Sequence, residues 1–524
     1  MLTTMRTQIH NLVEEAARTR GGTPALTYQN VTITYAGLWR EVASFGTTLN
    51  GLGVRCGDRV AVYLDKRIET VTALFGTSAG DGVFVPVNPL LRPKQVGYIM
   101  RDCSARVLVT SPERFALLRD ELEECKSVEH VVLVGQDRSA EPGSRYAVSS
   151  WPIATEGGVF AAHAIDVDMA AILYTSGSTG QPKGVVLSHR NLIAGAESVS
   201  HYLGNTPNDV ILSVLPFSFD AGLSQLTTAF SVGAHVILLN YLLPADVVRL
   251  CAQHRITGLT GVPPLWIQIA DEDWPDEAAK HLRYFANTGG KMPKATLDRL
   301  RSLFPGATPF LMYGLTEAFR STYLDPAEVD RRPGSIGKAI PNAEILVVRP
   351  DGSVCDPGEE GELVHRGALV AMGYWNDPER TAQRFRPVPA RESGLCTDEI
   401  AVWSGDTVVR DEDGLLYFVG RNDEMIKTSG YRVSPTEIEE AAYDTALVRD
   451  AVALGVEDMK LGQHVVLVVS PTSGTRLDVE CLLARMRQAL PLYMLPQSVK
   501  VKPEIPRSPN GKFDRALLRK ELTE

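Results

Sequence analysis

The sequence predicts an α/β protein with a large N-terminal domain and a small α+β C-terminal domain. Three observations lead to this prediction. Short apolar runs alternate with helical periodicity through most of the chain, which is typical of mostly parallel sheets covered by helices. Beyond about residue 335, strand-like runs flank Asp-Gly turn signals, and the tail mixes helical and strand patterns. A chain of 524 residues has room for about three or four structural units.

The first layered α/β subdomain is expected from about residue 24 to residue 135. Its strand candidates are RVAVYL, VFVPVN, ARVLVTS and HVVLVG, and helical stretches separate them. The polar stretch 138–165 predicts a surface connection, and a second layered subdomain is then expected to begin with AAILYTS. Further strand candidates in that second subdomain are VILSVLPF, AHVILLN, ITGLTGV, LRYFANTGG and PFLMYGL.

After about residue 335 the pattern favours a β-rich subdomain. AEILVVRPDGSVCDPGEEGELVHRG and VWSGDTVVRDEDGLLYFVGR each hold two strand-like runs around an Asp-Gly turn signal. Strand character stops and glycine recurs in GRNDEMIKTSG, which marks the next boundary. We therefore predict a core domain over residues 1–421 and a small C-terminal domain over residues 422–524.

The composition narrows the classes of function. The net charge is −10, from 53 basic and 63 acidic residues, so nothing favours binding to nucleic acid or to an anionic membrane. The seven scattered cysteines form no Cys-x-x-Cys pair, which favours reduced thiols in a cytoplasmic protein without a zinc site. The N-terminus lacks a signal-peptide core, and no run reaches the roughly 18 apolar residues of a membrane helix.

The stretch LYTSGSTGQPKGVVLSH, residues 173–189, follows an apolar run and predicts a phosphate-binding loop. Glycines free backbone N–H groups, and together with the hydroxyls and one ammonium these groups form a cradle for anions. A Walker A loop has Ser or Thr directly after its lysine, but here Gly184 follows Lys183. The loop therefore indicates phosphate binding without the usual mononucleotide ATPase arrangement.

YTSGSTGQPKGV resembles the phosphate-loop signature of the adenylate-forming enzymes. That superfamily comprises acyl-CoA synthetases, the adenylation domains of nonribosomal peptide synthesis and beetle luciferases. Further stretches resemble its other signatures, in family order and across almost the entire chain. They are NTGGKMPK, YGLTEA, WSGDTVVRDEDG, FVGRNDEMIKTSGYRV and PRSPNGKFDRALL. The resemblance implies ATP and Mg²⁺ as cofactors, and formation of an acyl-adenylate whose acyl group passes to a thiol.

The resemblance also implies roles for particular residues. Tyr313 would stack on adenine, Asp406 and Arg421 would bind the ribose, and Glu317 would be the Mg²⁺ ligand. Taken alone, Glu317 could equally be an acid that complements a helix N-terminus. The implied catalytic residues are Lys512, Glu317, Lys183 and Thr316, and the implied cofactor-binding residues are Thr175, Ser176, Gly177, Ser178, Thr179, Gly180, Lys183, Gly289, Gly290, Lys291, Tyr313, Gly314, Thr316, Asp406, Arg421 and Lys512.

The C-terminal signatures imply a mobile small domain. Lys512 would bridge the substrate carboxylate and the α-phosphate of ATP, whereas an isolated lysine near a C-terminus is ordinarily a solvated surface residue. Asp423 would be the hinge about which the domain turns. After that turn Gly430, which lacks a side chain, would let a phosphopantetheine arm pass close to the backbone.

The segment LPFSFDAGLSQLTTAF bears on the substrate. By resemblance to amino-acid-activating domains, Asp220 would bind the substrate ammonium, since a carboxylate in an apolar pocket needs a cation. The alternative is a helix N-cap without a substrate role. Arg320 is unusual in such a pocket and could pair with an acidic group of the substrate, with Asp220 or with a surface neighbour. The implied pocket residues are Asp220, Ala221, Ser224, Gly261, Ala286, Thr288, Gly289, Met312 and Arg320.

The acyl acceptor stays open at this point. YGLTEAFRSTYL and VFVPVNPLL resemble stand-alone acyl-CoA-ligase-type members, including those associated with exosortase systems. Because the chain carries no condensation or carrier-protein domain, we expect a free-standing enzyme of specialised metabolism that loads an amino acid, or an acid bearing an amino group, onto a separate carrier protein. The alternative is a fatty or aryl acid transferred to coenzyme A.

A luciferase-like oxidation and a non-catalytic scaffold are competing classes of function. The presence of Lys512 and Glu317 disfavours the scaffold.

Overall fold

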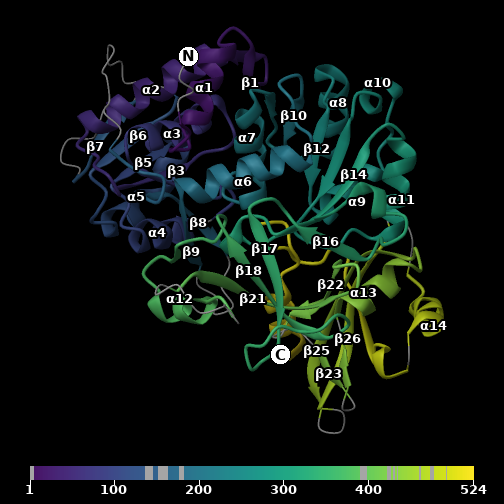
Figure 1. The fold of residues 1–524 in the computed structure, drawn as a ribbon. Helices are drawn as coiled ribbons and strands as arrows, with labels where there is room; N and C mark the ends of the chain where they lie inside the picture. The colour runs from purple at the N-terminus through teal and green to yellow at the C-terminus, as the bar shows by residue number, and fades with distance from the viewer. Residues whose placement is uncertain are drawn as a thin grey trace.

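The computed structural model describes residues 5–91, 93–135, 145–151, 163–175, 182–389, 398–421, 426–428, 431–433, 435–458, 462–472, 477–490 and 492–523. Layered sheets and helices form the large N-terminal part of the chain, and a smaller unit, drawn in yellow-green and yellow, holds its C-terminal end (Figure 1). The predicted α/β class, with a large N-terminal and a small C-terminal domain, is confirmed.

The first sheet has the strand order β19-β9-β8-β4-β3-β5-β6-β7. AAILYTS, expected to open the second subdomain, instead forms β8, which pairs with β4 in this first sheet. β9 returns antiparallel to β8, because the short connection between them cannot make the crossover that a parallel pair needs. The strands are β3 (Arg59–Tyr63), β4 (Val83–Pro86), β5 (Val107–Thr110), β6 (His130–Leu133), β7 (Ala147–Ser150), β8 (Met169–Thr175), β9 (Lys183–Ser188) and β19 (Gly373–Tyr374), and the helices of this part are α1 (Asn11–Arg20), α2 (Tyr35–Gly51), α3 (Ile68–Ala79), α4 (Pro93–Asp102), α5 (Pro112–Glu124) and α6 (His189–Tyr202).

The second sheet is longer than the sequence pattern predicts, because the β-rich subdomain continues it through the pairs β15–β16 and β16–β22. At its other edge, β1 and β2 come from the N-terminus and pair beside β11. The strands are β1 (Pro24–Tyr28), β2 (Val31–Thr34), β10 (Val210–Ser213), β11 (His235–Leu238), β12 (Gly258–Gly261), β13 (Tyr284–Asn287), β14 (Thr308–Tyr313), β15 (Thr322–Leu324), β16 (Ser335–Ala339), β17 (Ala343–Val348), β18 (Glu360–Gly367), β20 (Phe385–Pro387), β21 (Ile400–Arg410) and β22 (Leu416–Arg421).

The connections of this second sheet follow the predicted pattern. Strands β10 to β14 pair in parallel, and both predicted Asp-Gly hairpins form, as β17–β18 and β21–β22. The helical segments are α7 (Asp220–Val232), α8 (Pro244–His254), α9 (Pro263–Ala270), α10 (Asp276–Ala279), α11 (Lys294–Leu303), α12 (Pro378–Arg384) and the 3₁₀ turns η1 (Thr316–Ala318) and η2 (Pro326–Glu328).

The C-terminal unit has its own sheet, with the order β24-β23-β26-β25 and β27 beside β26. It matches the α+β pattern expected of the tail. The strands are β23 (Ile426–Thr428), β24 (Tyr431–Val433), β25 (Val448–Asp458), β26 (Gly462–Pro471) and β27 (Ser498–Val501), and the helical segments are α13 (Pro435–Tyr443), α14 (Val479–Ala489), α15 (Arg515–Thr523) and η3 (Leu492–Met494).

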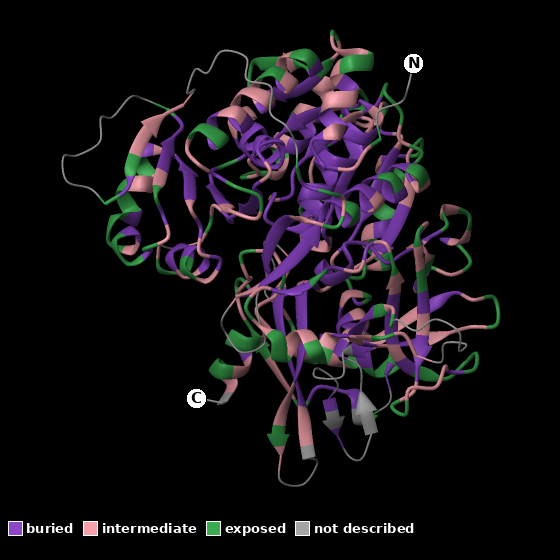
Figure 2. Ribbon diagram, turned by 60° about the vertical axis from the view of Figure 1, so that its left-hand side comes forward, coloured by how far each residue is buried: buried purple, intermediate pink, exposed green. Residues whose placement is uncertain are grey.

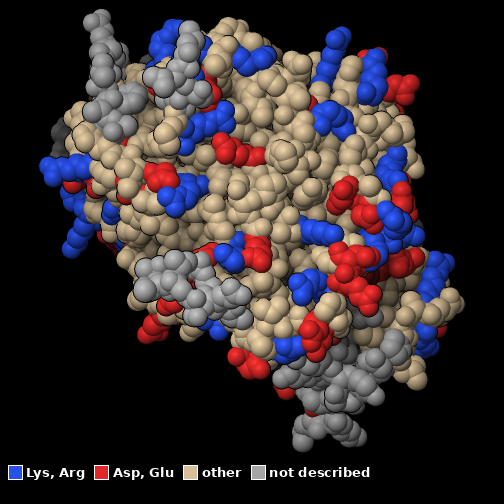
Figure 3. All heavy atoms as spheres, in the orientation of Figure 1, with Lys and Arg blue, Asp and Glu red and all other residues tan. Residues whose placement is uncertain are grey.

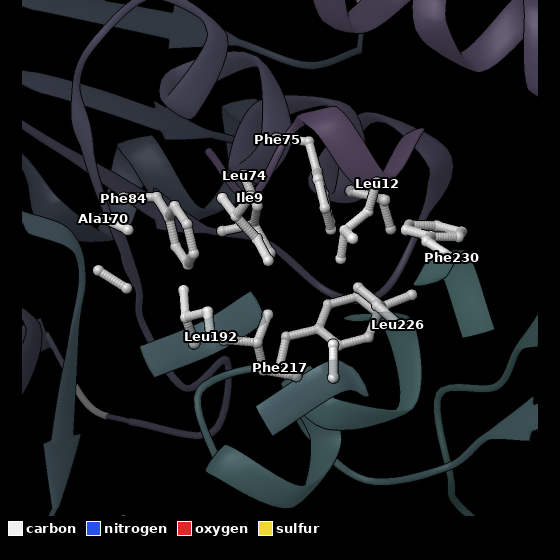
Figure 4. Close-up of a cluster of buried hydrophobic side chains, with 14 of the residues drawn as sticks. Ile9, Leu12, Leu74, Phe75, Phe84, Ala170, Leu192, Phe217, Leu226 and Phe230 are labelled. Atoms are coloured by element: carbon white, nitrogen blue, oxygen red, sulfur yellow. The ribbon is translucent and has the colours of Figure 1, made fainter. Parts of the chain in front are cut away.

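The two layered subdomains share one hydrophobic core (Figure 4). Phe75 of α3 meets Phe230 of α7 edge to face, with ring centroids 5.2 Å apart, an arrangement that adds about 0.5–1.5 kcal/mol to the burial of the rings. Leu12 and Leu226 pack in the same cluster. The strands are largely buried, and exposed positions fall mostly on helices and loops (Figure 2). This shared core fixes β8 and β9 relative to α7.

Among the described residues, no helix combines the length and the apolar character needed to cross a bilayer. On the face shown in Figure 3, basic and acidic side chains are interspersed. That face therefore presents no extended basic surface of the kind that binds a polyanion.

Candidate nucleotide and acid site

The predicted phosphate loop connects two strands of the first sheet. Thr175 ends β8 and lies opposite Lys183, the first residue of β9. Ser176, Gly177, Ser178, Thr179 and Gly180 lie outside the described residues. Nζ of Lys183 lies 2.8 Å from Oε1 of Glu317 and 2.8 Å from the hydroxyl of Tyr374. The loop lysine thus meets the predicted metal ligand directly.

Glu317 lies in the 3₁₀ turn η1, directly after β14, with Thr316 buried beside it. The tyrosine hydroxyl of Tyr374 donates a hydrogen bond of 2.6 Å to the same Oε1. Burial alone would raise the pKa of Glu317, but the charge and hydrogen bond of Lys183 and the hydrogen bond of Tyr374 lower it to about 2. The side chain is therefore a carboxylate at neutral pH, held by two donors rather than only complementing a helix terminus.

Tyr374 is a residue of this site that no pattern in the sequence indicates. It comes from the short strand β19, where it lies opposite Val185 of β9. Its backbone N–H donates to Oγ1 of Thr381 at 2.9 Å, and its ring lies 4.3 Å below the Lys183 ammonium. Because it is 191 residues from Lys183 in sequence, no local pattern could connect the two.

The residues around Glu317 fit a Mg²⁺ ion bound together with nucleotide. No group of three or more His, Cys, Asp or Glu side chains in the described part of the chain forms a metal cage. Mg²⁺ bound beside phosphates usually takes only one or two protein carboxylates, and water and phosphate oxygens complete its shell. One ionised carboxylate beside a phosphate-loop lysine is a suitable donor set.

The predicted ribose ligands lie on neighbouring strands. Asp406 of β21 is 2% exposed and lies directly opposite Arg421 of β22; the side chain of Arg421 is outside the described atoms. The hydroxyl of Tyr313 donates to Oδ2 of Asp406, and the ring of Tyr313 lies 6.2 Å from that of Phe418. The aromatic and acidic residues expected to hold the nucleoside are therefore in contact, and Gly314 follows Tyr313 at the end of β14.

The Gly-Gly segment forms a tight turn after β13. Gly289 has a φ of +75°, a conformation that side chains rarely adopt, and Asn287 donates from Nδ2 to the carbonyl oxygen of Gly290 at 2.8 Å. A Cβ at Gly289 would stand 4.0 Å from Cε of Lys512. The C-terminal lysine is exposed but lies against this turn, at the junction with the large domain.

Two further contacts join the small domain to the large one. Nζ of Lys291 lies 2.6 Å from Oε1 of Glu440 on α13, and Asn88 donates to the carbonyl oxygen of Pro509 at 3.1 Å. The contact of Asn88 with Pro509 and the approach of Lys512 to Gly289 place the loop of residues 507–514 beside the Gly-Gly turn. The predicted hinge Asp423 and tunnel residue Gly430 lie outside the described residues.

Asp220 and Arg320 form a buried ion pair. Nη1 of Arg320 lies 3.3 Å from Oδ2 of Asp220, and the residues are 2% and 3% exposed, respectively. Asp220 is the first residue of α7 and the N-cap is Phe219, which makes no side-chain cap, so the alternative N-cap role is wrong. A surface partner for Arg320 is likewise wrong. Burial raises the pKa of Asp220, and the charges of Arg320 and Lys512 oppose that rise.

Each partner of this pair also carries an atom without a hydrogen bond. Among the described residues, Oδ1 of Asp220 and Nε of Arg320 are buried and find no partner. Buried polar groups are rarely left in this state, because each costs about 1–3 kcal/mol. The two residues of the pair therefore offer one unused acceptor and one unused donor within the predicted acid pocket.

A small cavity of about 20 Å³ adjoins Arg320. Four predicted pocket residues line it, namely Ala221, Ser224, Met312 and Arg320. Gly261, Ala286 and Thr288 lie on or beside β12 and β13, which border it at Thr260 and Tyr284. Its other lining residues are Val199, Leu203, Ile211, Gln225, Thr228 and Ala229. The predicted substrate residues thus converge between α6, α7 and the parallel strands.

The chain is similar to known proteins along almost its whole length. The family model described as AMP-binding enzyme matches residues 13–375, and that of the AMP-binding enzyme C-terminal domain matches residues 437–512. Feruloyl-CoA synthase from Amycolatopsis is 30% identical over 503 residues, covering 95% of this chain and 96% of that protein. The solved structure of ATP-bound MatB from Rhodopseudomonas palustris superimposes with a TM-score of 0.84 at 25% identity, covering 98% and 99% of the two chains.

A second kind of relative is a much larger protein. A linear gramicidin synthase from Brevibacillus parabrevis is 28% identical over 513 residues, which are 97% of this chain but only 10% of that protein. The chain thus spans about a tenth of the length of that relative. The family matches cover most of the chain and include the phosphate loop, η1 and the C-terminal lysine. The chain therefore belongs to the AMP-binding enzymes of the adenylate-forming superfamily, and it is an AMP-forming acid–thiol ligase that uses ATP with Mg²⁺.

Proposed function

We propose that this ligase activates an acid that bears an amino group and transfers it to the phosphopantetheine thiol of a separate carrier protein. The observation that supports the amino group is the buried Oδ1 of Asp220, which has no partner among the described residues. A substrate ammonium placed there would donate a charge-assisted hydrogen bond, the strong kind in a buried site. The carboxylate to be activated would then point toward the Gly-Gly turn and Lys512.

Formation of the adenylate brings two anions together, because the substrate carboxylate attacks the α-phosphate of ATP and pyrophosphate leaves. In our proposal Lys512 lies between the carboxylate and the α-phosphate, and Lys183 holds the departing phosphates. Glu317 would bind Mg²⁺, which supplies positive charge to the leaving pyrophosphate when bound. The residues act by positioning and by electrostatic stabilisation.

The nucleoside would be held at the junction of β14, β21 and β22. Tyr313, with Gly289, Gly290 and Gly314 nearby, would form the adenine site. The carboxylate of Asp406 suits a ribose diol because it accepts two donors at once. The hydrogen bond that Tyr313 donates to Asp406 would fix that carboxylate before the ribose arrives. Thr175, Thr316 and the residues Ser176–Gly180 would complete the phosphate site.

We further propose that the small domain is residues 422–524 and that it turns about Asp423 between the two half-reactions. The present arrangement, with Lys512 against Gly289, suits formation of the adenylate. Rotation would withdraw Lys512 and bring Gly430 to the path of the thiol. Lys512→Ala should therefore lose carboxylate-dependent exchange of pyrophosphate into ATP by about 100-fold or more, while transfer from a preformed adenylate survives. Equal loss in both half-reactions would contradict the alternation.

The second candidate is an aryl- or fatty-acyl-CoA ligase located, like the first, in the cytoplasm. Its support is the match along nearly the whole length of feruloyl-CoA synthase, whereas the gramicidin synthase is matched over a tenth of its length. Purified enzyme, ATP and substrate can be offered either coenzyme A or a panel of phosphopantetheinylated carrier proteins. Acyl-CoA formation at a higher kcat/KM than any acyl-carrier product would overturn the carrier proposal.

The amino group is tested separately, through pyrophosphate exchange with amino acids of both hands, β-amino acids, fatty acids and aryl acids. The proposal expects exchange with an amino-bearing acid. It also expects Asp220→Asn to lower the kcat/KM for that acid by at least about 10-fold, with less effect on acids without nitrogen. Turnover confined to acids that lack nitrogen would overturn it.

A further inference from the structure

The buried charges of the acid pocket must balance, and a substrate amino group alone does not balance them. Asp220 and Arg320 already neutralise each other at 3.3 Å, and both are almost fully buried. An ammonium added at Oδ1 of Asp220 brings a second cation next to one carboxylate. In the proposed function the carboxylate to be activated is matched by Lys512, so it does not balance the ammonium. A buried charge without a counter-charge is strongly destabilising, so a second anionic group of the substrate must supply the missing negative charge.

The position for that anion is marked by Arg320. Its Nη1 is used by Asp220 and by the carbonyl oxygen of Phe319, at 3.3 and 3.1 Å, but its Nε has no partner among the described residues. A guanidinium presents its donors in a fixed fork that suits a carboxylate. Arg320 also lines the small cavity, whose other polar lining includes Ser224, Gln225 and Thr228.

The cavity limits the size of the group. Its volume of about 20 Å³ compares with the roughly 10–15 Å³ that one water needs on the same scale. Its walls are buried side chains of the core, among them Val199, Leu203 and Ile211, and such interiors are close-packed. By that comparison the cavity has room for one or two water-sized groups and none for a long alkyl chain.

We infer that the substrate is a small amino acid with a short anionic side chain, of the size of aspartate, whose ammonium meets Asp220 and whose second carboxylate meets Arg320. This inference rests on the proposed function, since it takes the amino group as given. With both groups bound, the pocket holds two cations and two anions and uses its unpaired acceptor and donor. Arg320 is then a residue that determines specificity.

Four acids separate the two claims in one assay of carboxylate-dependent pyrophosphate exchange by the full-length enzyme. Aspartate has both groups, alanine has only the amino group, succinate only the second carboxylate, and butyrate neither. We expect aspartate to exceed each of the others by at least about 100-fold in kcat/KM, as for sites built to pair a polar group. Asparagine, the uncharged isostere, should be at least about 10-fold poorer than aspartate.

The possible failures are distinguishable. Alanine or asparagine at or above aspartate would overturn the inference while the amino-group proposal stands. Succinate at or above aspartate would overturn the amino group, and with it the inference. Butyrate at or above aspartate would overturn both claims.

The enzyme side supplies a second measurement. Arg320→Met leaves Asp220 unpaired and could prevent folding, so the double variant Asp220→Asn, Arg320→Met, which removes both charges, is the fairer test. We expect its ratio of aspartate to butyrate activity to fall by at least about 100-fold relative to the natural enzyme. An unchanged ratio would overturn the inference, because neither residue would then select the acid.

Discussion

Lys183 and Glu317 are 134 residues apart in the sequence, yet Nζ of the lysine lies 2.8 Å from Oε1 of the glutamate. One belongs to the strand that leaves the phosphate loop, and the other to the 3₁₀ turn after β14, so the pair joins the two large sheets at the nucleotide site. Tyr374 closes the arrangement, because its hydroxyl accepts from the lysine and donates to the glutamate. The charges expected to face pyrophosphate and Mg²⁺ are therefore held in place by the protein itself.

Tyr374→Phe tests this arrangement. The change removes one hydroxyl and keeps the ring that packs below Lys183, so we expect a folded enzyme whose pyrophosphate exchange falls by about 10-fold, as expected for one buried charge-assisted hydrogen bond. The Mg²⁺ concentration at half-maximal rate should rise as well, since Glu317 loses a donor that orients it. A merely structural defect would lower the rate without moving the Mg²⁺ dependence.

Tyr241→Phe is the matched control. Its hydroxyl also bonds a side chain, Gln268, but at an exposed position. This variant should keep both the rate and the Mg²⁺ dependence of the natural enzyme. If the two variants behave alike, Tyr374 does not position the ion pair.

We expect the ion pair of Lys291 with Glu440 to favour one orientation of the small domain. The pair crosses between the domains at 2.6 Å and is 36% exposed on both sides, so its contribution to stability is at most about 1 kcal/mol. An energy of that size is enough to shift an equilibrium between two domain orientations several-fold. We therefore expect Glu440→Gln to slow adenylate formation by about 2- to 5-fold and to leave thiol transfer from preformed adenylate unchanged or faster.

Salt gives an independent check on this prediction, because exposed pairs are screened. Raising the ionic strength should slow adenylate formation by the natural enzyme more than by Glu440→Gln. Glu480→Gln, an exposed acid at the start of α14, is the control for a simple loss of charge on the small domain. Equal salt dependence in the natural enzyme, Glu440→Gln and Glu480→Gln would show that the Lys291–Glu440 pair does not favour one domain orientation.

The sequence predicts the strands of this fold better than their arrangement. Buried parallel strands such as β4, β5 and β8 are short continuous apolar runs, which local periodicity detects. Their partners depend on long-range contacts. The placement of β1 beside β11 and of β8 beside β4 follows from a shared core that no window of the sequence contains.

The same limit applies to the site. The sequence predicts the phosphate loop because its glycines, hydroxyls and lysine all lie in one short stretch. Tyr374 and the pairing of Asp220 with Arg320 are not local, since these contacts span 191 and 100 residues. Three partners for Arg320 are therefore compatible with the sequence, and only the packing of α7 against the turn after β14 shows that Asp220 is one of them and a surface neighbour is not.

A buried lysine predicts a pH dependence of stability. Lys66 follows β3 and donates from Nζ to the carbonyl oxygens of Leu239 and Ser213, at 2.8 and 3.2 Å. Its ammonium also lies 5.8 Å from the ring of Phe217, in the segment that leads to Asp220. Burial lowers the pKa of Lys66 to about 7. A neutral amine still has two N–H donors for the two carbonyls, so the contacts survive loss of the proton.

The sign of the effect follows from proton binding. Between pH about 7 and the ordinary lysine value of about 10.5, the unfolded chain holds a proton that the folded chain has lost. Stability therefore rises with pH across this window, by at most about 1.4 kcal/mol for each pH unit. Below pH about 7 the folded and the unfolded chain both carry the proton. The loss of stability caused by the buried ammonium of Lys66 is therefore greatest there and no longer changes with pH.

Lys66→Met isolates this contribution, because the side chain keeps its length and loses its titration. Between pH 7 and pH 9.5, the midpoint of urea unfolding should rise more, or fall less, in the natural protein than in the variant. Lys94→Met, at an exposed position of α4, should follow the natural protein. Parallel pH dependences in the natural protein and Lys66→Met would show that Lys66 keeps its proton throughout. The ammonium of Lys66 would then connect the first α/β subdomain to the segment around Phe217, and that segment would be held equally at every pH.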